Sequence, residues 1–203
     1  MSTSSAPYHH GDLRAACVRA ALELLEEGGS AEVSLRAVAR RVGVASSAPY
    51  RHYADRDALL SAVAAVGYRE LADFLAAAHP APSAPDDLAA VAVAYVQFAL
   101  QRPALFRVMF GEPCDRDSAE RVAATEAISA YVAAIVRHAF PGADPDALAT
   151  AVWALVHGLA FLHLDGKLDA ADPAAVTARV TAAVHAVLTA SAAMTSPGTS
   201  RQA

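Results

Sequence analysis

The residues that could support catalysis or bind a metal ion gather in one apolar stretch near the C-terminus. His157, His163 and Asp165 lie there within nine residues. The two histidines are six positions apart, about 600° around a helix, so they diverge by about 120° and do not form the i, i+4 pair of a helical metal site. No Ser or Cys nucleophile stands beside them. We therefore predict no catalytic residue, no metal site and no cofactor. Both histidines are expected to be buried and hydrogen-bonded, with contact to a ligand as the alternative.

A second group of residues that could have a chemical role is the arginines between Arg36 and Arg56, because guanidinium groups recognise phosphate and guanine. The 203-residue chain has a net charge of −5, but residues 1–56 hold seven arginines against six acids. The remainder holds nine basic residues against fifteen acids. Within the first block the acids mostly precede residue 33 and the arginines mostly follow it. The local basic charge, rather than the whole-chain charge, is relevant to a phosphate contact.

The composition indicates that helices position these groups. The chain has 53 alanines and is 55% apolar but only 6% aromatic, and no segment alternates as a strand would. Alanine is the best helix former, so we predict an all-α fold. Two cysteines are too few for a disulfide scaffold or a zinc site, and the N-terminus has no signal-peptide pattern. We therefore expect a cytoplasmic location.

One segment reaches the lower length limit of a membrane span. Residues 147–164 carry no formal charge over eighteen positions. The segment is rich in alanine rather than leucine, contains two histidines and lacks flanking basic anchors. We predict a helix buried in protein and no membrane partner.

The first part of the chain contains signals for three short helices and one long helix. An amphipathic pattern over 13–28 ends at two glycines, and Ser34 can cap a short helix that Gly43 closes. The segment Val44 to Tyr53 is a third short helix, and Asp55 can cap a long helix that runs to about residue 78. A glycine turn between the second and third helices indicates a helix-turn-helix unit.

A proline-rich break over 79–85 separates this unit from further helices. These are expected over 86–101, 105–110 and 117–140, followed by two apolar helices near the C-terminus. We predict a helix-turn-helix domain over 9–54, a helical C-terminal domain over 55–194, and a disordered tail over 195–203.

The string SLRAVARRVGVASSAPYRHYADRDALL, residues 34–60, carries a more specific pattern. It includes Gly-Val, five further residues, then Tyr-x-His and an aromatic residue, at 43–53. Over residues 9–60 the chain resembles the DNA-binding domain of the tetracycline-repressor-like (TetR) family of bacterial transcription regulators. This resemblance implies a homodimer in which Val44 to Tyr53 lies in the DNA major groove, while an all-helical C-terminal domain binds a small molecule and dimerises. Residues 102–110 and the Trp-x-x-x-His-Gly run at 153–158 resemble segments of one branch of the same family.

Side-chain chemistry suggests roles within the DNA-binding segment. Arg51 has the planar fork that pairs with guanine, and the hydroxyls of Ser46 and Ser47 can bond base edges or phosphate. The resemblance adds Tyr50 and His52 as DNA-backbone contacts. The full predicted set is Ser34, Arg36, Ser46, Ser47, Ala48, Tyr50, Arg51, His52 and Arg56.

Alternatives to these roles remain. Tyr50 or Tyr53 could belong to the core, Tyr53 above all, and Arg40 and Arg41 could be solvated charges. The family usually has Ser or Thr where this chain has Ala45, so we expect the helix cap to move to Ser46, with Pro49 in the first turn.

Bulky side chains are rare after residue 100 and stand among alanines, a combination that can line a pocket. The predicted ligand contacts are Phe106, Phe110, Tyr131, Trp153, His157 and Phe161. The alternative is that these rings fill a core thinned by alanine.

The last two helices carry apolar residues at steps of three and four, which suits helix-on-helix packing. The predicted dimer interface is Leu148, Val152, Leu155, Leu159, Val180, Val184 and Val187. Together these features predict a ligand-responsive transcriptional regulator, a repressor that binds a palindromic operator as a homodimer and is released by an apolar small molecule. The alternatives are an activator of the same fold and a helical small-molecule-binding protein without a DNA role.

Overall fold

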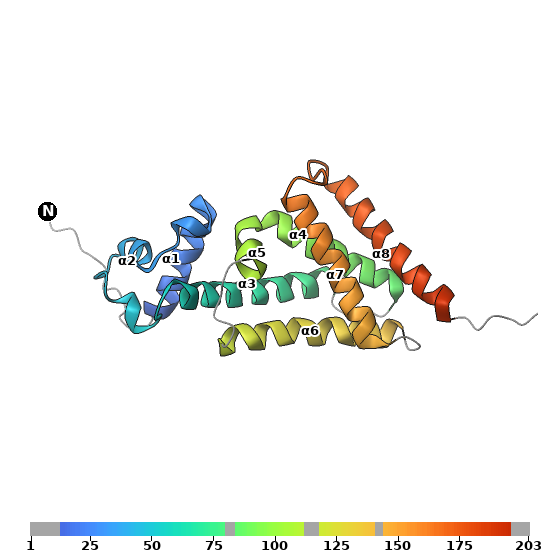
Figure 1. Ribbon diagram of the computed structural model, residues 1–203, viewed down its shortest axis with the longest axis horizontal. Helices are drawn as coiled ribbons and strands as arrows, with labels where there is room; N and C mark the ends of the chain where they lie inside the picture. The colour runs from blue at the N-terminus through green and yellow to red at the C-terminus, as the bar shows by residue number, and fades with distance from the viewer. Residues whose placement is uncertain (1–12, 80–83, 112–117, 141–143, 196–203) are drawn as a thin grey trace, which may run out of the picture.

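The computed structural model describes residues 13–79, 84–111, 118–140 and 144–195. Within these ranges the regular elements are α-helices and two short 3-10 helices, with no strand, so the predicted all-α fold is confirmed (Figure 1). The elements are α1 (Leu13–Gly28), η2 (Ser30–Glu32), α2 (Leu35–Val42), η3 (Pro49–Arg51), α3 (Arg56–Ala78), α4 (Pro85–Gln101), α5 (Pro103–Phe110), α6 (Ala119–Ala139), α7 (Pro145–Leu164) and α8 (Pro173–Thr195). Of the predicted tail over 195–203, only Thr195 is described, as the last residue of α8.

Local side-chain chemistry fixes the helix ends of the N-terminal unit. The Ser34 hydroxyl accepts a hydrogen bond from the Ala37 amide at 3.1 Å and caps α2. Gly43 ends α2 with φ 77°, a left-handed conformation that favours glycine. The Asp55 carboxylate accepts from the Ala58 amide at 2.8 Å and caps α3. All three predicted boundary residues are confirmed.

The segment predicted as a third short helix, Val44 to Tyr53, is less regular than expected. It forms hydrogen-bonded turns, with the Ala48 amide donating to Ala45 O at 2.9 Å, followed by the 3-10 helix η3. Pro49 has no N–H and therefore cannot extend a regular α-helical ladder from the residues before it. The N-cap of η3 is Ala48, without a side-chain hydrogen bond, so the predicted cap at Ser46 is wrong.

The long helix α3 connects the N-terminal unit to the rest of the chain (Figure 1). Its 23 residues span about 35 Å. Near its start, Leu59 and Leu60 are fully buried in the hydrophobic core, and Leu71 and Leu75 are buried further along. Helices α4, α5 and α6 all pack against α3. One helix therefore contributes to the packing of both halves.

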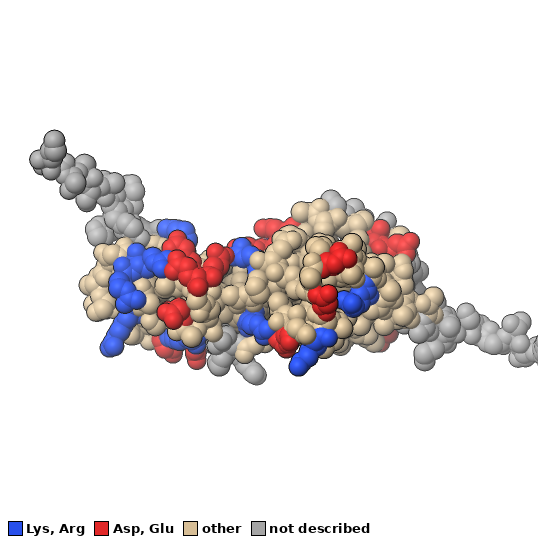
Figure 2. All heavy atoms as spheres, turned by 90° about the horizontal axis from the view of Figure 1, so that it is seen from above, with Lys and Arg blue, Asp and Glu red and all other residues tan. Residues whose placement is uncertain are grey.

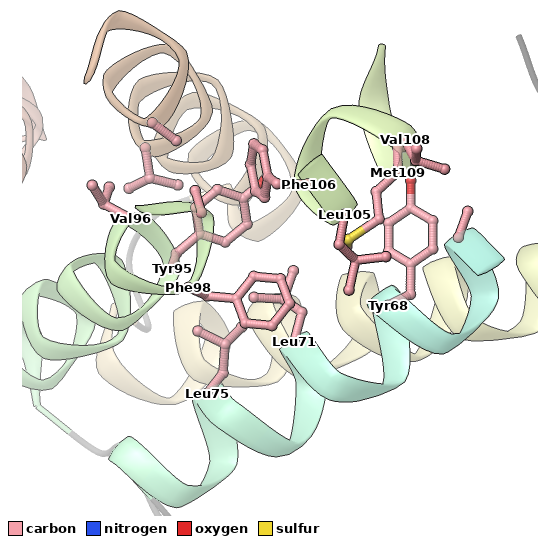
Figure 3. Close-up of a cluster of buried hydrophobic side chains, with 14 of the residues drawn as sticks. Tyr68, Leu71, Leu75, Tyr95, Val96, Phe98, Leu105, Phe106, Val108 and Met109 are labelled. Atoms are coloured by element: carbon pink, nitrogen blue, oxygen red, sulfur yellow. Dashed lines mark hydrogen bonds between the residues drawn. The ribbon is translucent and has the colours of Figure 1, made fainter. Parts of the chain in front are cut away.

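Helix α5 approaches α3 closely at a glycine. A Cβ added to Gly67 would lie 2.6 Å from Met109 Sδ and 3.0 Å from Leu105 Cδ1, so only glycine fits without displacement. Next to it, the Tyr68 hydroxyl donates a hydrogen bond to Met109 O at 2.8 Å. Figure 3 shows Tyr68 of α3 beside Leu105, Val108 and Met109 of α5. Gly67 and Tyr68 thus fix α5 on α3.

Helix α4 is covered by both C-terminal helices, since α7 and α8 each pack extensively on it. The buried side of α8 is a line of apolar residues at steps of four, Val176, Val180, Val184 and Leu188. Helix α7 is long and apolar enough to cross a membrane by length and composition alone. Its buried side includes Leu148, Val152, Val156 and Ala160, so in this structure α7 packs as a helix of the bundle.

Candidate DNA interface and effector cavity

The N-terminal unit presents a basic surface. Arg36, Arg40 and Arg51 are exposed, and the described part of the chain offers none of them an ion-pair partner. Lysine and arginine atoms are conspicuous at the end of the molecule that carries the N-terminal unit (Figure 2). Exposed guanidinium groups on a compact helical unit suit contact with DNA phosphates.

Two other arginines of the same region bond within the protein. Arg41 of α2 pairs with Glu27 at 2.6 Å and with Glu23 at 3.2 Å, both on α1. This hydrogen bonding lowers the pKa of the Glu27 carboxyl and raises that of Arg41. Arg56 donates to Val33 O at 3.0 Å and to Ser30 O at 2.7 Å, and so holds the segment before α2. Sequence reasoning missed both roles, because it had no means to place α1 or residues 30–33 beside these arginines.

The predicted DNA-contacting residues of the 46–52 segment are mostly accessible. Ser46, Ser47, Arg51 and His52 are exposed, and Tyr50 is 50% exposed, whereas Ala48 is half-buried. Pro49 within the segment and Tyr53 directly after it are buried instead, as the alternative for Tyr53 predicted. The Tyr53 hydroxyl donates to Arg14 O at 3.1 Å, and burial raises the pKa of Tyr53 to about 12.

The other half of the molecule contains a cavity of about 430 Å³ between α3, α4, α5, α6 and α7. Two predicted ligand contacts, Phe110 and Trp153, line it. Phe106 is fully buried and packs against Phe110 and Phe161 with ring centroids 4.7 and 5.5 Å away. Phe106, Tyr131, His157 and Phe161 are not among the residues that line the cavity, so the structure places only part of the predicted set there.

Several lining residues were missed by sequence reasoning. Tyr68 and Leu71 come from α3 and Tyr95 comes from α4. On α6, Ile128 and Val132 line the cavity at the four-residue spacing that marks one helix face. Asp146 is the only lining residue with a formal charge. The cavity is therefore predominantly apolar and aromatic, which suits an apolar small molecule.

A small polar network stands at the edge of the cavity. The Tyr95 hydroxyl and His157 Nδ1 form a hydrogen bond of 3.0 Å. Burial raises the pKa of Tyr95 far above its usual range, and the neighbouring Trp153 partly offsets this rise. Burial also lowers the pKa of His157, which favours the neutral imidazole.

The two histidines singled out in the sequence differ in their surroundings. His157 is hydrogen-bonded but only half-buried. His163 is buried as predicted, but neither ring nitrogen has a hydrogen-bond partner among the described residues, which corrects the prediction for this residue.

The predicted dimer interface requires a correction. Five of its seven residues, Leu148, Val152, Leu159, Val180 and Val184, are buried within the single chain, where α7 and α8 pack on α4. Leu155 and Val187 are half-buried. The exposed residues of α7 include the small Ala147, Ala151, Ala154 and Gly158 beside the larger Trp153 and Leu162, and those of α8 include Ala175, Ala178, Ala182 and Ala186.

The chain matches two descriptions of known protein families. "Bacterial regulatory proteins, tetR family" matches residues 18–63. "Tetracyclin repressor-like, C-terminal domain" matches residues 88–193, more than half of the chain.

Individual proteins agree with this assignment. Over 92 residues the chain is 39% identical to an HTH-type transcriptional regulator from Mycobacterium bovis, which covers 44% of this chain and 39% of that protein. The match thus spans about two fifths of the length of that curated relative. A solved structure of a protein of unknown function from Rhodococcus sp. RHA1 is 34% identical, with a TM-score of 0.75, and the alignment covers 89% of this chain and 97% of that one.

A tetR-family regulatory protein from Rhodococcus RHA1 shares the fold at 22% identity, with a TM-score of 0.64 and coverage of 86% of this chain and 96% of that one. The helix-turn-helix unit, the arrangement of the eight α-helices that the described residues form, and these similarities lead to one conclusion. The chain belongs to the TetR family of bacterial regulatory proteins and is a helix-turn-helix transcriptional regulator.

Proposed function

We propose that this regulator is a cytoplasmic repressor that binds a palindromic operator as a homodimer and leaves it when a small apolar molecule enters the cavity. In this proposal residues 9–54 contact DNA, and residues 55–194 bind the effector and dimerise. The main support for this proposal is that α3 runs through both halves of the molecule. The helix packs into the N-terminal unit at Leu59 and Leu60, and it lines the cavity at Tyr68 and Leu71.

A ligand in the cavity thus contacts the helix that carries the DNA-binding unit. If the ligand binds more tightly to an arrangement in which the two recognition segments are wrongly spaced, it lowers operator affinity by that difference in binding free energy. Two half-sites about one helical turn apart on the DNA make such spacing decisive.

The exposed arginines support the DNA contact. Arg51 is the base-reading candidate, and Arg36 and Arg40 lie on the adjacent helix α2 with Ser34 as its cap. Ser46, Ser47, Tyr50 and His52 are the further contacts proposed within the segment, beside Ala48. Arg56 has a supporting role in this proposal, because its guanidinium bonds Val33 O and Ser30 O.

Operator binding is tested by fluorescence anisotropy with the DNA upstream of the protein's own gene over a range of salt concentrations. We expect log Kd to rise linearly with log salt concentration, and Arg51→Ala to weaken specific binding. Arg137→Ala, an exposed arginine on α6, is the control with the same charge change and should leave binding unchanged. Unchanged sequence preference in Arg51→Ala would show that Arg51 does not read bases. A reporter under this upstream DNA should rise when the protein is deleted, and a fall would identify an activator.

The effector cavity is tested with the neutral apolar dye N-phenyl-1-naphthylamine. Trp153 is the only tryptophan of the chain and lines the cavity, so its emission reports occupation directly. Ala133 lines the cavity and its neighbour Ala134 is exposed. Ala133→Phe should weaken dye binding about tenfold or more by filling the cavity, whereas Ala134→Phe should not. Equal binding by both variants would place the dye elsewhere.

Dimerisation is proposed to use the exposed sides of α7 and α8. Apart from Asp146 at the start of α7 and His185 on α8, the exposed residues of these two helices are uncharged and mostly small. Small side chains allow helices to approach closely, and depletion of charge is typical of the centre of an interface. The buried seam of Val152 and Val184 supports the dimer only indirectly, by holding α7 and α8 on α4.

A further inference from the structure

A second hollow lies where the N-terminal unit meets the rest of the molecule. It is a groove of about 340 Å³ lined by one face each of α1 and α3, by Tyr53 and by the first turn of α6. Its apolar lining includes Val18 and Leu22 of α1 and Ala62 and Val66 of α3, at the four-residue spacing of a single helix face. Val18, Leu22 and Val66 are half-buried, so apolar surface remains open to solvent along the groove.

The charged residues of this groove are predominantly basic. Arg14, Arg19 and Arg69 line it together with a single acid, Glu120. Glu120 pairs with Arg14 at 2.7 Å. Arg19 and Arg69 are exposed and have no ion pair with any residue that the structure describes. The groove therefore has a formal charge excess of two positive units beside an apolar surface.

We propose that this groove binds a small organic anion, a carboxylate with a short apolar body. Arg19 and Arg69 would receive the carboxylate, because guanidinium groups form charge-assisted hydrogen bonds with it. The apolar body would cover Val18, Leu22 and Val66. The effector cavity has the opposite character, since Asp146 is its only charged lining residue, and an anion is disfavoured there. The site is thus distinct from the effector cavity in position and in ligand chemistry.

A ligand in this groove would affect how the N-terminal unit is held against the rest of the molecule. One wall of the groove belongs to α1 and the other to α3 and α6. A bound anion would therefore contact both the N-terminal unit and the half of the molecule that contains the effector cavity, the effector half. It favours the arrangement in which these elements stand side by side over any arrangement in which they separate.

The test is isothermal titration calorimetry with octanoate as the probe and 1-octanol as its neutral counterpart. The wild-type protein should bind octanoate more tightly than octanol, and Arg19→Gln/Arg69→Gln should weaken octanoate binding about tenfold or more. Arg36→Gln/Arg40→Gln is the control, because it removes the same charge from exposed arginines outside the groove, and its affinity should match the wild type within about twofold. All four residues are exposed, so each variant should retain the wild-type melting temperature.

The single tryptophan separates this site from the effector cavity. Octanoate in the groove should leave Trp153 emission unchanged, because Trp153 lines the other cavity. Equal octanoate affinity in wild type and Arg19→Gln/Arg69→Gln would overturn the proposal. So would octanol binding as tight as octanoate, or a change in Trp153 emission that follows octanoate binding. None of these outcomes depends on operator binding, so the proposal fails or stands separately from the proposed function.

Discussion

The contact between α3 and α5 at Gly67 yields a prediction whose sign depends on one neighbouring side chain. In Gly67→Ala the new Cβ would lie 2.6 Å from Sδ and 2.9 Å from Cγ of Met109. Real Cβ contacts are longer than this, so Met109 must move. Its side chain is 1% exposed, and Leu105 beside it is equally buried, so little space is available. The substitution therefore overpacks the core.

The expected change in the free energy of unfolding is the sum of two opposing contributions. Overpacking a well-filled core costs about 1–3 kcal/mol. Replacing glycine by alanine inside a helix returns about 1 kcal/mol. We expect a net loss of about 0–2 kcal/mol in the free energy of unfolding of Gly67→Ala. In a Met109→Ala background Sδ and Cγ of Met109 are gone and only Leu105 Cδ1, at 3.0 Å, stays close to the new Cβ, so the same substitution should cost less than in the wild type or stabilise the protein by up to about 1 kcal/mol.

The assay is urea unfolding followed by circular dichroism, on the four proteins of this double-mutant cycle at one protein concentration. The second readout is operator affinity, because α5 carries Phe110 of the effector cavity and Gly67 seats α5 on α3. A loss of stability of the same size in both backgrounds would refute the packing argument. An operator affinity unaffected by Gly67→Ala, in a protein with shifted stability, would refute the link from the cavity through α5 to the DNA-binding unit.

Three further predictions concern the dimer face, pH and the support of the recognition unit. Ala154→Glu should yield monomers in sedimentation velocity while the exposed control Ala134→Glu stays dimeric, and a dimeric Ala154→Glu protein would refute the proposed face. Burial lowers the pKa of His157. As the pH falls through about 6.5, this side chain therefore binds fewer protons in the folded protein than in the unfolded chain. Stability should fall as the pH drops below that value, and His157→Asn should reduce this slope in thermal melts; an unchanged slope would contradict the assignment. Arg56→Lys should lower the free energy of unfolding by about 1–3 kcal/mol through loss of bonds to two carbonyl oxygens, whereas Arg40→Lys should have no effect; equal melting temperatures would disprove the supporting role.

The parts of the N-terminal unit that could be predicted are those set by neighbours in sequence. The caps at Ser34 and Asp55 bond amides three residues ahead, and Gly43 takes a left-handed φ, so each depends only on a local pattern. Arg41 and Arg56 could not be assigned in this way. Their partners are 14 to 26 positions away, so their roles follow from how α1 and residues 30–33 pack on α2 and α3.

The sequence predicted the kinds of residue that line the effector cavity better than it predicted which individual residues line it. Phe106 and Phe110 are one helical turn apart on α5, and both are aromatic residues in an alanine-rich domain. The first is fully buried and the second lines the cavity, because the seating of α5 at Gly67 sets which ring reaches the space. Tyr68 lines the cavity although it belongs to the helix shared with the DNA-binding unit. A sequence pattern does not state how one helix is rotated against another.

The predicted dimer interface shows what the spacing of apolar residues along a helix cannot establish. A seven-residue spacing such as that of Leu148, Leu155 and Leu162 drifts by about 20° per repeat on a straight helix. The buried line of α7 therefore follows steps nearer four, through Val152 and Val156, and leaves Leu162 43% exposed. The pattern correctly indicated that α7 packs against other helices but assigned the contact to a partner chain rather than to α4.

The contacts that join the two halves bear on the proposed release of DNA by a ligand. Besides the shared helix α3, α1 is tied to the effector half by ion pairs from Arg14 to Glu120 at 2.7 Å and from Arg102 to Glu26 at 3.0 Å. Arg102 also pairs with Glu70 of α3 at 3.0 Å. Exposed ion pairs of this kind contribute about 0–1 kcal/mol each. Coupling free energies between sites are typically about 1–3 kcal/mol. These ion pairs are therefore weak enough to be outweighed by a difference in ligand affinity between two arrangements, while the core around Leu59 and Leu60 keeps the DNA-binding unit itself intact.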